Sequence, residues 1–153
     1  MILCYILMSL SGLMMALSGL QGHFQFKLLH ANHPTFALLT MIIYLFTETL
    51  VMFFFVGTGV SIKEYVLERK LSTDFQKRSF KVKMRVYPPL LLNILLFMIL
   101  FISGGAVDTH RIPNGIHGML FLIVLIHFLY VIYVQHLCFK ENTQIVLEMS
   151  GIQ

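Results

Sequence analysis

Four long apolar stretches, separated by short polar ones, constrain the fold of this chain more than any other feature. They occupy approximately residues 2–22, 35–61, 86–107 and 115–139. Each is long enough to cross the ~30 Å hydrocarbon core of a bilayer as a helix of about 20 residues. With 58% hydrophobic residues, the chain also has more apolar surface than a water-soluble domain can bury. We therefore predict an all-α membrane protein, a single integral domain of four transmembrane helices in a bundle, because backbone groups in lipid need internal partners.

The polar connections differ from one another in charge, and this difference predicts the orientation. Eight of the eleven basic residues lie in the loop 62–85. The positive-inside bias places that loop in the cytoplasm as a basic hairpin, with both termini on the same side and short noncytoplasmic loops opposite. Five of the seven histidines lie in the other two connections: His23, His30, His33, His110 and His117. Because the basic residues flank membrane spans, membrane lipids explain the net charge of +4 and no nucleic-acid partner is predicted.

Several local patterns predict where helices begin, end and make contact. Four small residues on one face of the first helix indicate close packing inside the bundle or against a partner chain: Ser9, Gly12, Ala16 and Gly19. Pro88 and Pro89 are predicted to open the third helix. The loop 62–85 is predicted to begin as a helical extension of the second span over residues 62–69. The alternation of apolar and basic residues over 80–86 is typical of a short amphipathic hairpin on lipid headgroups, or of a partner-binding segment. The tail 140–153 is predicted to form a separate short interfacial helix.

Two ionisable residues are predicted at mid-membrane depth, where each requires a partner or a role. Glu48 lies near the middle of the second span and His127 near the middle of the fourth, so a Glu48–His127 pair is geometrically allowed. Such a pair fits half of a proton relay, a contact to a quinone head group or a metal site. It equally fits a buried hydrogen bond that fixes helix register. Asn93, Gln135 and His136 mark a polar level nearer the cytoplasm, where we expect interhelical hydrogen bonds.

A second group of residues lies at the noncytoplasmic end. His33 and His117 are predicted at matching depth, at the mouths of two parallel helices, and Arg111 adds a cation nearby. A b-type haem needs two such histidines and cationic groups for its propionates. In span count and histidine placement the chain resembles the four-to-five-helix b-type cytochrome membrane anchors of respiratory complexes, including those of succinate dehydrogenase type. The resemblance implies a haem held by these histidines, although His33 directly precedes Pro34 and would bind at a helix cap.

A third interpretation treats the same end as a metal site. Asp108, His110 and His30 could join His33 and His117 as imidazole and carboxylate ligands for zinc, copper or iron. The alternative is that these side chains are solvated, pair with one another or contact lipid phosphate.

Together these features predict a small integral subunit of a larger respiratory or electron-transfer complex in an energy-transducing membrane, a bacterial inner membrane or its organelle equivalent. Other integral subunits are the expected partners, and haem b and quinone the expected cofactors. The chain is not expected to be catalytic alone, because its loops are short and carry no nucleophile with an assigned base. A cofactor-free structural or assembly subunit is the first alternative, and a metal or proton transport component is the second.

Overall fold

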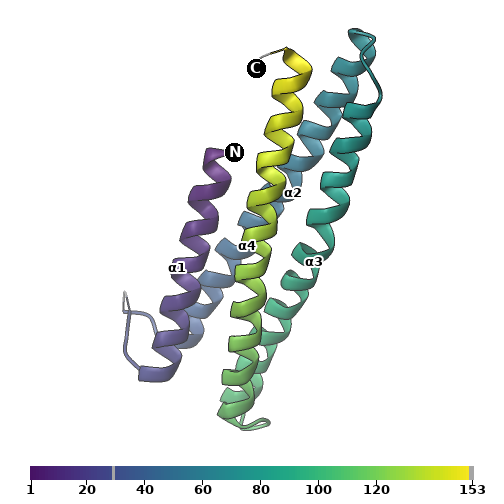
Figure 1. The fold of residues 1–153 in the computed structure, drawn as a ribbon. Helices are drawn as coiled ribbons and strands as arrows, with labels where there is room; N and C mark the ends of the chain where they lie inside the picture. Colours follow the sequence, from purple (N-terminus) through teal and green to yellow (C-terminus); the bar gives the residue numbers. More distant parts are fainter. Residues whose placement is uncertain (29, 152–153) are drawn as a thin grey trace.

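The computed structural model describes residues 1–28 and 30–151 and consists of helices and short connections (Figure 1). The four helices are α1 (Ile2–Phe24), α2 (His33–Glu68), α3 (Asp74–Asp108) and α4 (Asn114–Ser150). Within the described ranges there is no strand beyond an isolated bridge between Leu28 and Ala31. All four helices are long and apolar enough to cross a membrane. The prediction of an all-helical chain with four such helices is confirmed.

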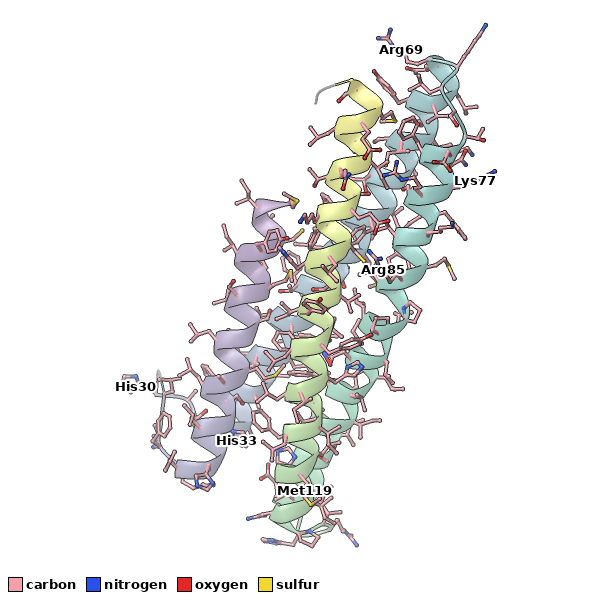
Figure 2. All side chains as sticks on the ribbon, in the orientation of Figure 1. His30, His33, Arg69, Lys77, Arg85 and Met119 are labelled. Atoms are coloured by element: carbon pink, nitrogen blue, oxygen red, sulfur yellow. The ribbon has the colours of Figure 1, made fainter. Side chains whose placement is uncertain are left out.

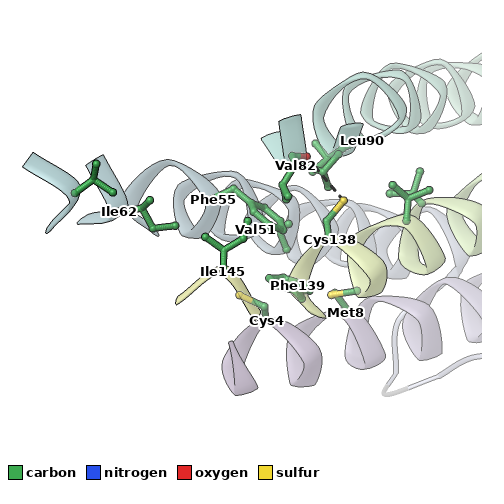
Figure 3. Packing of buried hydrophobic residues seen from close by; sticks show 14 residues of the cluster. Cys4, Met8, Val51, Phe55, Ile62, Val82, Leu90, Cys138, Phe139 and Ile145 are labelled. Atoms are coloured by element: carbon green, nitrogen blue, oxygen red, sulfur yellow. Dashed lines mark hydrogen bonds between the residues drawn. The ribbon is translucent and has the colours of Figure 1, made fainter. Parts of the chain in front are cut away.

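Consecutive helices lie side by side and run in alternate directions (Figure 1). α1 packs on α2, α2 on α3 and α3 on α4, whereas α4 meets α1 over a much smaller contact. The buried apolar side chains form two clusters. In the cluster shown in Figure 3, the ring of Phe139 from α4 stacks on Phe55 from α2 at 5.0 Å between centroids. In the second cluster, Tyr44 from α2 stacks on Phe97 from α3 at 4.4 Å.

Most of the apolar surface faces outward. In the most apolar stretch of each helix, only between 17% and 33% of the residues are buried by the rest of the chain. Large side chains such as Phe53 and Ile126 are exposed by about two thirds. A helix exposing apolar residues on several sides is stable in lipid, where these groups meet hydrocarbon, but not in water.

The helix ends explain how such short connections reverse the chain. At the start of α2, the side chain of Asn32 accepts hydrogen bonds from the backbone and hydroxyl of Thr35, and Pro34 occupies the first turn, where its missing N–H costs nothing. After α2 and after α3, a residue with positive φ reverses the backbone: Lys70 at 51° and His110 at 58°. In both turns the next residue donates its N–H back into the last turn of the helix, as in a Schellman motif.

The helical extension predicted at the start of the loop 62–85 is present, but the hairpin predicted over 80–86 is wrong, because that stretch belongs to α3. α2 runs on to Glu68 and α3 begins at Asp74, which leaves a turn of only five residues, 69–73. Within the supposed alternating stretch, Val82 and Val86 are buried while Phe80 and Met84 are exposed. Burial therefore follows the four-residue helical spacing and not a period of two. At 1.5 Å per residue, the 36 residues of α2 span about 54 Å, so its basic end extends beyond a ~30 Å hydrocarbon core.

Two other expected boundaries also lie inside helices. In its described part, residues 140–151, the predicted tail is no separate helix, because α4 continues to Ser150 and is capped by Gly151, whose φ is 73°. Residues 152–153 lie outside the described residues. Asn142, within this tail, is buried and accepts a hydrogen bond from Thr58 of α2. Pro88 and Pro89 do not open α3 but lie inside it. The helix continues through them because Val86 and Leu90 on either side are fully buried against neighbouring helices.

The small residues of α1 are only partly used for packing. Gly12 lies against the ring of Phe128, and Gly19 lies against the ring of Phe121, both on α4. Ser9 and Ala16 are exposed. The two glycines, seven residues apart, let two aromatic rings of α4 approach the backbone of α1, which is where these two helices meet.

Candidate functional site

The histidine pair predicted from the sequence is brought together at one end of the bundle. His33 lies in the first turn of α2 and His117 in the first turn of α4, and their ring centroids are 6.3 Å apart at an angle of 71°. Each ring also rests against a glycine of a neighbouring helix. A Cβ on Gly22 of α1 would lie 3.0 Å from the His33 ring, and one on Gly104 of α3 would lie 3.4 Å from the His117 ring. All four helices therefore contribute to this end.

A serine of α3 determines which nitrogen of His117 carries the proton. Ser103 Oγ lies 2.6 Å from the carbonyl oxygen of Leu100 and 2.8 Å from His117 Nδ1. The hydroxyl has one proton, which it donates to the carbonyl, so it accepts the second hydrogen bond from Nδ1–H. The lone pair of the neutral His117 imidazole is therefore on Nε2. In His33, Nδ1 is buried and has no hydrogen-bond partner among the described residues.

The other residues predicted for this end do not gather into a metal site. Asp108, His110 and Arg111 are exposed around the turn after α3, and His30 is exposed in the connection before α2. Within residues 1–28 and 30–151, no group of three or more His, Cys, Asp or Glu side chains is positioned to hold a metal ion. The structure thus places two imidazoles together but does not assemble the larger ligand set.

A layer of polar side chains crosses the middle of the bundle. Asn93 of α3 donates from Nδ2 to the hydroxyl oxygen of Tyr44 on α2 at 2.7 Å. The Oδ1 atom of Asn93 lies 2.9 Å from His127 Nδ1 on α4 and accepts a hydrogen bond from Nδ1–H. Asn93 thereby joins three helices. On the other side of α2, Thr47 bonds Ser11 of α1 at 2.9 Å, so the layer includes all four helices.

Glu48, the buried acid predicted from the sequence, is in this layer but has a different partner. Gln135 Nε2 of α4 donates to Glu48 Oε2 at 2.5 Å, and both side chains are fully buried. No hydrogen bond joins Glu48 to His127 in the described part of the chain. The sequence identified both residues and Asn93 as important, but not Tyr44, which lies one helical turn before Glu48 and therefore on the same face of α2.

The opposite end of the bundle carries the basic residues. Figure 2 shows Arg69 and Lys77 toward one end, Arg85 nearer the middle, and His30 and His33 toward the other end. Two ion pairs tie α3 to α4 here: Arg78 to Glu148 at 2.6 Å, and Arg85 to Glu141. The histidine end and the basic end are therefore separate. The side of the membrane that each end faces stays a prediction.

Comparison of the chain with protein-family models, with curated proteins and with solved structures finds no match. Two groups of side chains in the described residues offer chemistry: the histidine pair and the central polar layer.

Proposed function

We propose that this chain is a small integral subunit of a respiratory or other electron-transfer membrane complex, and that His33 and His117 hold a b-type haem. The observation that carries this proposal is the approach of the two rings to 6.3 Å at the ends of α2 and α4. At this separation the two imidazoles are close enough that both could ligate one metal ion through bonds of about 2 Å. The proposal agrees with the resemblance to cytochrome membrane anchors.

The residues at the histidine end have the chemical groups that a b-type haem requires. His117 offers Nε2 as a ligand, while its Nδ1–H is held by Ser103, the arrangement that orients a ligating histidine. His33 has a buried nitrogen without a partner, which a ligand would satisfy. Arg111, exposed at the same end, supplies a positive charge suited to a propionate. When bound, a haem would supply one-electron transfer, and the chain would orient its ligands and exclude water.

Absorption spectroscopy tests the proposal. The chain is expressed with haem available, purified in mild detergent, and its reduced-minus-oxidised spectrum is recorded. We expect a b-type spectrum that is lost in His33→Ala and in His117→Ala. His23→Ala serves as the matched control, because His23 is also at this end but exposed, and its spectrum is expected to equal that of the wild type. A featureless wild-type spectrum, or one unchanged in both variants, would remove haem from this subunit.

A quinone head group is the second ligand that this proposal includes. Its carbonyl oxygens accept hydrogen bonds, and the polar layer offers donors in an apolar setting through Tyr44, Asn93 and His127. Binding of a short-chain quinone to the purified subunit tests this interpretation, with Asn93→Leu expected to weaken it.

The hydrogen bonds within the polar layer favour an alternative function, that of a structural subunit without a cofactor. Asn93 already joins Tyr44 and His127 by hydrogen bonds, as expected of a residue that only fixes helix register. If this alternative holds, partner subunits co-purify in mild detergent and neither histidine variant changes what is recovered. A transport role would instead require proton or metal flux into vesicles that depends on Glu48.

A further inference from the structure

The pair formed by Glu48 and Gln135 leaves two buried atoms without partners. Each side chain is fully buried, and the hydrogen bond from Gln135 Nε2 to Glu48 Oε2 uses only one oxygen of the carboxyl group. Glu48 Oε1 and Gln135 Oε1 are both buried and have no hydrogen-bond partner within residues 1–28 and 30–151. Both atoms are acceptors if the carboxyl group is ionised, so neither can satisfy the other.

The surroundings of Glu48 do not favour a negative charge. The ion pairs of the described residues lie at the basic end and engage Glu141 and Glu148 instead. The hydrogen-bond partner of Glu48, Gln135 of α4, is a neutral amide. Tyr44, one turn away on the same face of α2, is a neutral phenol, and His127 is hydrogen-bonded to Asn93. A carboxylate with one neutral hydrogen bond in an apolar interior is strongly disfavoured relative to the acid.

We propose that Glu48 and Gln135 form a proton-binding site in the middle of the membrane. Glu48 carries a proton on Oε1 and donates a hydrogen bond through it to Gln135 Oε1. Gln135 Nε2 continues to donate a hydrogen bond to Glu48 Oε2. The acid and the amide then make two reciprocal hydrogen bonds, and both unpartnered atoms are satisfied at once. The terminal torsions of Glu and Gln are soft, so a small rotation of either group aligns them. Release of the proton leaves a carboxylate and breaks one of the two bonds.

The polar layer gives this site neighbours through which a proton could be exchanged. Tyr44, one turn along α2 toward the histidine end, is joined through Asn93 to His127. Hydroxyl, amide and imidazole groups thus lie between the acid and the histidine end. The inference is independent of haem, because none of these residues belongs to the histidine pair.

Infrared difference spectroscopy on the full chain in detergent or lipid tests the proposal. At neutral pH we expect the C=O stretching band of a protonated carboxylic acid, present in the wild type and lost in Glu48→Gln. Glu64→Gln is the matched control, since Glu64 is on the same helix but exposed, and it should keep the band. In Gln135→Leu the band should move to higher frequency, because the acid loses both hydrogen bonds to the amide.

The stability of Glu48→Gln and its infrared difference spectrum also test the proposal. Glu48→Gln replaces the acid by a group of similar shape that can still pair with Gln135, so its circular dichroism spectrum and melting temperature at neutral pH should equal those of the wild type. A wild-type minus Glu48→Gln difference spectrum that contains only carboxylate bands at neutral pH would overturn the proposal.

Discussion

Ser103 shows how one hydroxyl group can set the chemistry of a histidine. It donates to Leu100 and accepts from His117, which fixes the proton on Nδ1. We predict that Ser103→Ala costs about 1–3 kcal/mol, because it leaves a partly buried donor without a partner. Unfolding of the purified chain in detergent measures this, and ¹⁵N chemical shifts of His117 should show loss of the single tautomer. Ser9→Ala, at an exposed position, is the control; equal effects of the two variants would contradict the assigned role.

The residue types that carry the site were predictable, but their partners were not. His33 and His117 are 84 positions apart, and the same separation joins Thr58 to Asn142. Glu48 and Gln135 are 87 positions apart, so α2 and α4 keep nearly one register along their length. Aligning the starts of the apolar stretches, 35 and 115, misses this register by one to two turns, enough to pair Glu48 with His127 and not with Gln135. The start of a hydrophobic run does not fix where a helix sits against its neighbour.

The contact between α1 and α4 depends on two glycines and gives a direct test of packing. A Cβ on Gly19 would lie 2.3 Å from the ring of Phe121, so the ring or the helix must move. We predict that Gly19→Ala destabilises the chain by about 1–3 kcal/mol. Gly57→Ala is the matched control, because a Cβ there meets nothing within 4 Å. It should be neutral or stabilising by about 0.5–1 kcal/mol, as is usual for glycine to alanine within a helix. Thermal unfolding in mild detergent compares the two.

The presence of each helix was easier to predict than the residues at which it begins and ends, and the segment 80–86 shows why. Val82 and Val86 point inward and Phe80 and Met84 outward, which a period of two in sequence does not distinguish over so few residues. The charged residues around them mark the end of the apolar stretch but not the end of the helix. Ion pairs such as Arg78–Glu148 then stabilise the polar extensions of α3 and α4 against each other.

We predict that the basic end of the bundle faces the cytoplasm and that the histidine end faces the other side of the membrane. Ser72 lies in the turn between α2 and α3 and Lys27 in the connection between α1 and α2, and both are exposed. The native Cys4 and Cys138 are buried, so background labelling by a membrane-impermeant thiol reagent should be low. In intact cells we expect Lys27→Cys to react and Ser72→Cys to be protected, because basic segments are retained in the cytoplasm. Inverted vesicles should reverse the pattern. Labelling of both positions from one side would contradict the four crossings, whereas the opposite pattern would overturn only the orientation.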